Sequence, residues 1–335
     1  MGEGEGWGPD MRNILLLLII ITFLTYPAFA QQPAKVARVG FVSSTGDSKA
    51  PGLLVEAFRQ KLRELGHVEG KNIRVEYRYA EGKLDRVPGF VDELVGLKVD
   101  ALVVSSVPAI RAAKRATTTV PVVMVISVDP VAIGIVKSLA QPGGNITGLV
   151  SLNRDLRKQS LELLKEAVPG LARVGVLWNS EGRASATAYK DYEAAAPSKK
   201  LQLQSLEVRG STPNLEGAFQ AAVKGRAGAL ITVSNSALAR NFKPIAELAL
   251  KNRLPSMSER SEYAEAGGLM DYSPDYAENF RRVAVYVDKI LKGAKPADLP
   301  IEPTKFNLVV NLKTAKQLGV AVPLDVVKRA NRVIK

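Results

Sequence analysis

The sequence predicts an α/β protein of two similar lobes, each a doubly wound parallel sheet with helices on both faces. Two observations carry this prediction. Apolar segments of strand length alternate with amphipathic helical segments along most of the 335 residues. The second half of the chain then repeats the order of the first at an offset of about 130 residues, which is the size of a domain.

The first half contains four segments with the apolar pattern of strands, separated by helical segments. Strands are expected at 38–44, 72–79, 100–104 and 120–126. Helices are expected at 53–65, 84–97 and 108–117, with a further short helix ending near Ala140. Pro108 suits the first turn of the third helix.

The second half shows the same rhythm. Strands are expected at 173–179, 201–208, 229–233 and 254–257, followed by later strands at 269–272 and 306–310. Helices are expected at 156–168, 185–199, 237–252, 274–291, 312–318 and 324–333, together with one that Ser211-Thr212-Pro213 caps and that ends near Lys224.

Four pairs of segments match in the same order between the halves. They are 38–40 with 173–175, 72–79 with 201–208, 100–105 with 228–234, and 120–122 with 254–256. Chance similarity between apolar strands is the alternative, and the conserved order of four matches disfavours it. Each half is therefore predicted as a β-α-β-α-β-α-β unit.

The stretch 141–149 (Gln-Pro-Gly-Gly-Asn-Ile-Thr-Gly-Leu) lies between the two repeats, and we expect it to carry the chain across a hinge. Its glycines would give a crossing strand backbone freedom, and it lacks the lysine of a phosphate loop. Segments near 267–268 and 293–303 are expected to form two further crossings. The first lobe is thus predicted at 31–148 plus 268–293, and the second at 149–267 plus 294–335.

Residues 1–30 are predicted to be a leader that contains a secretory signal. Arg12 precedes a short apolar run at 14–24, and Ala28-Phe29-Ala30 forms a small-x-small cleavage pattern. We expect translation to start at Met11, cleavage near Ala30, and a periplasmic or secreted protein. An uncleaved N-terminal anchor is the alternative.

Composition argues against several functions. The chain has no cysteine, which excludes disulfides, thiolate metal sites and a cysteine nucleophile. Its single histidine, His67, is expected as a surface turn residue, so neither a histidine metal site nor a nucleophile-base pair is predicted. Nucleotide-loop and nucleophile-elbow motifs are also missing from the sequence. We therefore expect no catalysis, no cofactor and no metal.

The net charge of the chain is +13, and removing residues 1–30 takes away three acidic and one basic residue, which leaves about +15. Lysine and arginine are scattered, without a basic run interleaved with aromatic residues. The pattern favours an anionic membrane or an acidic partner over nucleic acid, so no nucleic-acid partner is expected.

Polar residues follow the predicted strands at the edge where parallel sheets bind ligands. Hydroxyls at helix starts suit a carboxylate, Asp129, Glu259 or Asp271 suits an ammonium group, and Trp178 with Tyr272 suits an apolar wall. For each residue alone, loop capping is the alternative. Together they predict a site for an amino acid or similar zwitterion. The candidate residues are Ser43, Ser44, Thr45, Ser105, Ser106, Ser127, Asp129, Trp178, Asn179, Ser234, Asn235, Ser258, Glu259, Asp271 and Tyr272.

Six segments, at 31–35, 58–73, 141–149, 162–169, 265–270 and 286–296, carry a family resemblance. From about residue 31 onward the chain resembles the exported solute-binding proteins of ABC transporters, in the group with tryptophan- and tyrosine-binding members. The resemblance implies a type I periplasmic binding fold, with lobes joined by three crossings and ligand capture by closure. Ser105 to Pro108 and Asp129-Pro130 match the family's contact positions best. Ser258-Glu259-Arg260-Ser261 departs from the aromatic and Gly-Phe-Arg-like run of many members, so ligand identity is not carried over.

The expected function is the exported solute-binding component of an ABC import system. It would capture a small polar solute, an amino acid or related carboxylate, and deliver it to an ABC permease in the inner membrane. We expect a monomer. The alternative is a periplasmic ligand-sensing domain that signals to a membrane receptor without transport. An exported hydrolase is disfavoured by the single histidine and the absence of cysteine.

Overall fold

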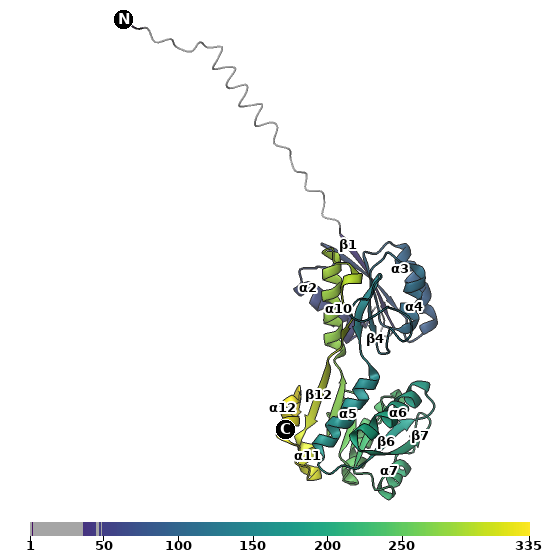
Figure 1. Ribbon diagram of the computed structural model, residues 1–335, viewed down its shortest axis with the longest axis vertical. Coiled ribbons are helices and arrows are strands. Elements are labelled where there is room, and N and C mark those ends of the chain that lie inside the picture. The colour runs from purple at the N-terminus through teal and green to yellow at the C-terminus, as the bar shows by residue number, and fades with distance from the viewer. Residues whose placement is uncertain (1, 3–35, 45–46, 48) are drawn as a thin grey trace. The chain divides into compact units, whose positions relative to one another are not determined.

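The computed structural model describes residues 2, 36–44, 47 and 49–335 (Figure 1). The predicted leader at 1–30, its cleavage site and Thr45 lie outside the described residues. Residues 37–335 form one compact unit. In the part of the chain that is described, every helix is too short or too polar to cross a membrane.

The first sheet has six strands in the order β11-β5-β4-β3-β1-β2, and all neighbours are parallel. Four of its strands were expected from the alternation of apolar segments, β5 overlaps the crossing strand predicted within 141–149, and β11 was not predicted as a strand. The strands are β1 (Ala37–Ser43), β2 (Ile73–Tyr79), β3 (Ala101–Val104), β4 (Val122–Ile126), β5 (Ile146–Val150) and β11 (Glu302–Pro303).

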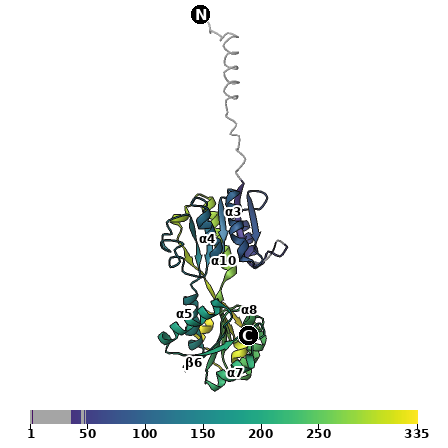
Figure 2. The same cartoon turned by 90° about the vertical axis from the view of Figure 1, so that its right-hand side faces the viewer.

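Helices cover both faces of this sheet (Figure 1, Figure 2). α2 (Leu53–Glu64) and α10 (Tyr276–Leu291) pack on one face around Phe41, whose ring lies 5.1 Å from that of Phe58 and 5.8 Å from that of Phe280. α3 (Val87–Gly96) and α4 (Val107–Ala116) pack on the other face. A short 3-10 turn, η1 (Leu84–Arg86), precedes α3. The first lobe is therefore doubly wound, as the sequence predicted.

The second sheet has seven strands in the order β13-β12-β10-β9-β8-β6-β7, and only the β10–β12 pair is antiparallel among the strands described. Its strands are β6 (Arg173–Asn179), β7 (Gln202–Val208), β8 (Ala229–Thr232), β9 (Ser256–Ser258), β10 (Met270–Pro274), β12 (Phe306–Asn311) and β13 (Arg332–Ile334).

Two hydrophobic cores hold the second sheet between its helices. One core contains residues of α5, α6, η2, α11 and α12, and the other contains residues of α7, α8 and α9. These elements are α5 (Asn153–Ala167), α6 (Arg183–Ala195), η2 (Ala196–Lys199), α7 (Leu215–Lys224), α8 (Ser236–Ala239), α9 (Phe242–Lys251), α11 (Leu312–Leu318) and α12 (Leu324–Arg329). The remaining short turn, η3 (Pro296–Asp298), lies against β5 of the first sheet.

The internal repeat predicted from the sequence is present in both sheets. The order β4-β3-β1-β2 in the first corresponds to β9-β8-β6-β7 in the second. Gly40 and Gly175 occupy equivalent places in β1 and β6, each covered closely by leucine. A Cβ on Gly40 would lie 3.0 Å from Leu102 Cδ1, and one on Gly175 would lie 2.7 Å from Leu206 Cδ1. Close packing thus explains the repeated Val-Gly pair.

The chain passes between the sheets three times: after β5, between β10 and α10, and between β11 and β12. Backbone bonds hold these segments side by side. The Thr304 N–H donates to the Val150 carbonyl (2.9 Å), and the Asp275 N–H donates to the Lys305 carbonyl (2.9 Å). Three adjacent crossings form a hinge that is connected through its own backbone.

The crossings lie a few residues from the expected lobe limits. β10 was grouped with the first lobe within 268–293, but it pairs with β9 and β12 in the second sheet. β11 was grouped with the second lobe within 294–335, but it pairs with β5 in the first. Both segments pair within one sheet along their length, and the chain crosses only after they end. The amino-acid composition carries no signal for the residue at which the chain crosses.

Local details also differ from the sequence prediction. The helix expected to end near Ala140 is a series of turns, because the Pro130 carbonyl accepts from the Ile135 and Val136 N–H groups. Asn214, rather than the preceding Ser211-Thr212-Pro213, caps α7 through a bond from the Gly217 N–H (3.0 Å). The last predicted helix ends at Arg329, and β13 follows it.

Candidate ligand-binding site

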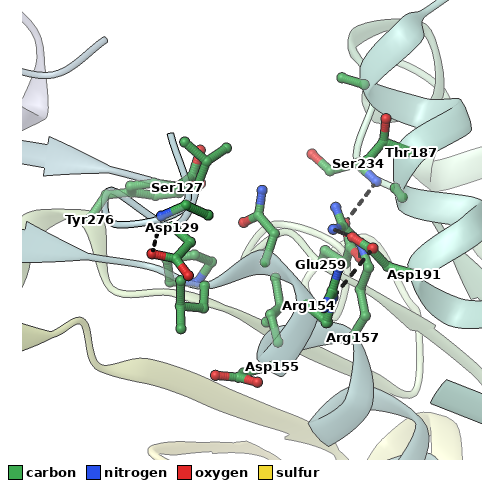
Figure 3. Close-up of a pocket in the computed structure, with 18 residues that line it drawn as sticks. Ser127, Asp129, Arg154, Asp155, Arg157, Thr187, Asp191, Ser234, Glu259 and Tyr276 are labelled. Atoms are coloured by element: carbon green, nitrogen blue, oxygen red, sulfur yellow. Dashed lines mark hydrogen bonds and ion pairs between the residues drawn. The ribbon is translucent and has the colours of Figure 1, made fainter. Parts of the chain in front are cut away.

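A cavity of about 880 Å³ lies beyond the carboxyl ends of β4, β8 and β9 (Figure 3). This volume is in the range of small-molecule sites. One wall follows β4 of the first sheet, another comes from α6 and the loops after β8 and β9, and the rest comes from the start of α5 and from residues beside the crossings. The lining residues are Ser127, Val128, Asp129, Ala132, Leu152, Asn153, Arg154, Asp155, Leu156, Arg157, Ala184, Thr187, Ala188, Asp191, Ser234, Glu259, Pro274 and Tyr276.

A buried ion network forms the wall on the second sheet. Arg157 donates from Nε to Glu259 Oε1 (3.1 Å) and from Nη1 to Asp191 Oδ2 (2.7 Å). The side chains of Arg157 and Glu259 are 8% and 3% exposed. Burying a charge is costly unless it is paired and hydrogen bonded, and here one guanidinium satisfies two carboxylates. The network therefore fixes the shape and charge of this wall.

Tyr192 and Ser234 complete the shell around Glu259. The Tyr192 hydroxyl donates to Glu259 Oε1 (2.8 Å), and the Ser234 N–H donates to Oε2 (3.3 Å). Burial, followed by the nearby negative charge of Glu259, raises the pKa of Tyr192 well above its usual value. Tyr192 therefore stays a hydrogen-bond donor at every physiological pH.

The first turn of α5 offers the cavity an exposed cation. Leu152 stands at the N-cap without a side-chain capping bond, and its carbonyl accepts from the Asp155 (2.9 Å) and Leu156 (3.1 Å) N–H groups. The N–H groups of Asn153 and Arg154, at the very start of the turn, are those that an anion could meet. The Arg154 side chain is 81% exposed and approaches Asp191 only at 3.9 Å. A carboxylate in the cavity would meet the helix start and this guanidinium together.

The wall on the first sheet carries Asp129, Ser127 and, from the start of α10, Tyr276 (Figure 3). Asp129 Oδ1 accepts from the Val131 N–H (2.9 Å) and the Ala132 N–H (3.2 Å), which fixes the turn after β4. Tyr276 is 55% exposed although it is a large aromatic residue. This side of the cavity thus combines a carboxylate, a hydroxyl and an aromatic ring.

Four of the residues predicted from strand ends line the cavity: Ser127, Asp129, Ser234 and Glu259. The described residues Ser43, Ser44, Ser105, Ser106, Trp178, Asn179, Asn235, Ser258, Asp271 and Tyr272 do not line it.

Several of these residues make structural contacts instead. Ser106 caps α4 and Asn235 caps α8, while the Asn179 side chain bonds to Gly210. Trp178 stacks on Tyr189 at 5.1 Å and donates to Ser205. Ser106 and Asn235 therefore have the capping role that was the alternative to ligand contact. Ligand contact by these residues stays a prediction.

Three further candidates on the second sheet also have structural partners. Asp271 is buried and accepts from the Ala264 N–H (3.1 Å), and the Ser258 hydroxyl donates to the Thr232 carbonyl (3.4 Å). Tyr272 bonds to Gln159 and packs on Phe306.

The cavity residues that helices supply were not among those predicted from the sequence. Arg157 and Asp191 come from α5 and α6, and Tyr276 begins α10. One signal was present: Arg157 falls on the buried face of α5 among leucines, where a charged residue requires a partner. His67 was also misjudged, because its imidazole is 14% exposed and bonds to Asp288 on α10 (2.8 Å).

Residues 35–334 match the family described as ABC transporter substrate binding protein. The chain belongs to this family. Among its relatives, the tyrosine-binding protein of Clostridioides difficile (strain R20291) is 24% identical to this substrate-binding protein over 268 residues, covering 78% of this chain and 75% of the relative. The resemblance inferred from the sequence is confirmed.

Solved structures share the fold of this substrate-binding protein. An ABC domain in complex with L-Trp from Streptococcus pneumoniae is 26% identical with a TM-score of 0.66, covering 89% of this chain and 99% of that one. A ligand-free, open substrate-binding protein with adhesive properties from Clostridium difficile is 23% identical with a TM-score of 0.73, covering 90% and 100%. At 23% identity, the similarity to the second structure shows only that the fold is shared. The two-lobed type I periplasmic binding fold is confirmed.

The described residues contain no cluster of three or more histidine, aspartate or glutamate side chains placed to hold a metal ion. The cavity instead brings together hydrogen-bond donors, carboxylates and an aromatic ring around a space of ligand size. These groups are suited to non-covalent solute binding.

Proposed function

We propose that this substrate-binding protein is the exported solute-binding component of an ABC import system. It captures a small polar solute in the cavity and delivers it to a permease in the inner membrane. The observation that carries the proposal is the composition of the cavity, which takes residues from both sheets and from the crossings between them. A ligand there contacts residues that follow strands of both sheets, so bending of the hinge changes its contacts.

Capture follows from this placement. A solute that bonds to Asp129 after β4 and to the Ser234 hydroxyl after β8 stabilises arrangements in which the two walls are close. Its differential affinity for the closed arrangement shifts the equilibrium toward closure. The permease then distinguishes the loaded protein by the shape of the closed form.

An amino acid is the ligand class that these groups support best. Its carboxylate fits the start of α5 and Arg154, its ammonium group fits Asp129 or Asp191, and an apolar side chain fits the ring of Tyr276. The relatives named for tyrosine and L-Trp favour the same class. The volume of about 880 Å³ accommodates an aromatic amino acid with water.

Calorimetric titration of the mature protein with the common amino acids and small carboxylates tests the proposal. We expect saturable binding of at least one amino acid, together with a smaller radius of gyration by X-ray scattering. The absence of binding across the panel, with unchanged scattering, would contradict it. Uptake into vesicles carrying the cognate permease would then separate transport from ligand sensing, which shares the binding step.

A further inference from the structure

We infer that Glu259 is a specificity-determining residue that occupies, as a built-in anion, the anion-binding position of the second-sheet wall. A ligand carboxylate is consequently excluded from this wall and is confined to the start of α5. The inference rests on the proposed solute-binding function and assigns the orientation of the solute within that site.

The donors around Glu259 are those that proteins use to hold a ligand carboxylate. They are the Arg157 guanidinium (3.1 Å), the Tyr192 hydroxyl (2.8 Å) and the Ser234 backbone N–H (3.3 Å). Charge-assisted bonds of this kind are roughly twice as strong as neutral ones. All three converge on a carboxylate that belongs to the protein, and Figure 3 shows Glu259 with Arg157 and Ser234 beside it.

Strand register explains why Glu259 reaches this position. β8 and β9 are parallel neighbours, with Thr232 opposite Ser258. The residues that follow these two strands therefore emerge side by side at the carboxyl edge, where a parallel sheet presents free N–H groups. Glu259 is the first residue after β9, so its side chain reaches the Ser234 N–H and closes that position to a ligand.

The charge of this wall also disfavours a ligand carboxylate. Arg157 is shared between Glu259 and Asp191, so its single positive charge faces two carboxylates. Arg154 comes no closer to Asp191 than 3.9 Å and is 81% exposed, so the buried part of the network keeps a net negative charge. A second anion at this wall would meet that charge at close range, where the dielectric is low. An ammonium group is attracted to the wall, while a second carboxylate on the solute is repelled.

Chemical rescue tests the inference directly, because removing Glu259 should leave an empty anion position. In E259A we expect acetate or formate to raise the melting temperature saturably by several degrees, relative to chloride at equal ionic strength. The wild type and D155A, which removes a different cavity carboxylate, should not respond. The double variant E259A/R157L should lose the effect. Acetate without a specific effect on E259A would overturn the inference.

A second measurement does not depend on a folded variant. The wild type should bind L-glutamine at least tenfold more tightly than L-glutamate, and L-asparagine more tightly than L-aspartate, since each pair differs only by the second carboxylate. Equal or stronger binding of the acidic member would overturn the inference. If no amino acid bound, the proposed function would fail, and the acetate experiment would still decide the role of Glu259.

Discussion

Gly148 of β5 lies directly beside Met124 of β4, and no other residue type fits there. The two are partners in the parallel register. A Cβ on Gly148 would stand 2.0 Å from the Met124 carbonyl oxygen, and its φ of 137° lies in the region that glycine adopts readily. The glycine in the stretch between the repeats is therefore required by strand packing in the first sheet, just before the crossing.

Replacing Gly148 by alanine should destabilise the protein by about 3 kcal/mol or more, because both the backbone angle and the contact with Met124 resist a side chain. Urea unfolding measures this. Gly144→Ala is the matched control: nothing lies within 4 Å of its added Cβ, and we expect a change within about 0.5 kcal/mol. Equal stability of the two variants would contradict the packing account.

Arg154 should contribute to affinity without contributing to folding. R154A is expected to weaken the binding of any amino acid that binds the wild type by about tenfold or more, through loss of one charge-assisted hydrogen bond. Its melting temperature should be unchanged, since the side chain is mostly exposed. Calorimetry gives the affinity, and K158A on the exposed face of α5 is the control. Unchanged affinity in R154A would place the ligand carboxylate elsewhere.

Asp271 should make stability depend on pH between about 4 and 8. Burial raises its pKa to about 8, above the unfolded value of 3.8. Because the pKa of Asp271 is higher in the folded state than in the unfolded state, the protonated side chain favours folding. This contribution to the free energy of unfolding is fully present below the unfolded pKa and is lost as pH rises through the folded pKa. Each pKa unit between the folded and unfolded values corresponds to about 1.4 kcal/mol in the free energy of unfolding.

The variant D271N should flatten this dependence, because an amide cannot ionise. Unfolding free energies at several pH values between 4 and 9 measure the slope for wild type and variant. D155N, at an exposed cavity position, should keep the slope of the wild type. A D271N curve parallel to that of the wild type would show that Asp271 is not the group responsible.

The crossings carry buried hydroxyls that make no hydrogen bond within the described chain: those of Ser151, Ser273 and Thr304. An unsatisfied buried hydroxyl is costly, so the isosteric change Thr304→Val should leave stability equal or raise it by about 1 kcal/mol. Thermal unfolding checks this, with Thr304→Ser as the variant that keeps the hydroxyl. Clear destabilisation by valine alone would mean that ordered water bridges the hydroxyls across the hinge.

The fold was predictable because its signals are local and repeated. Val39-Gly40 and Val174-Gly175 mark equivalent strands, and the rule for strand ends placed Ser127, Ser234 and Glu259 at the correct edge. Partners on helices were not predictable, since Arg157 and Asp191 meet only after α5 packs on α6.

The length of β10 explains why Asp271 and Tyr272, which were predicted to contact the ligand, do not line the cavity. β10 was expected to end at Tyr272, but it continues to Pro274. The cavity is therefore lined by Pro274 and Tyr276 rather than by Asp271 and Tyr272.

A distance measured between the two sheets shows whether the protein closes around a solute in this cavity. The chain has no cysteine, so labels on D92C in α3 and E216C in α7 report single-molecule energy transfer without background. A bound amino acid should shift the population toward a shorter distance, and R154A should require more solute for the same shift. Calorimetric binding with an unchanged distance distribution would contradict it.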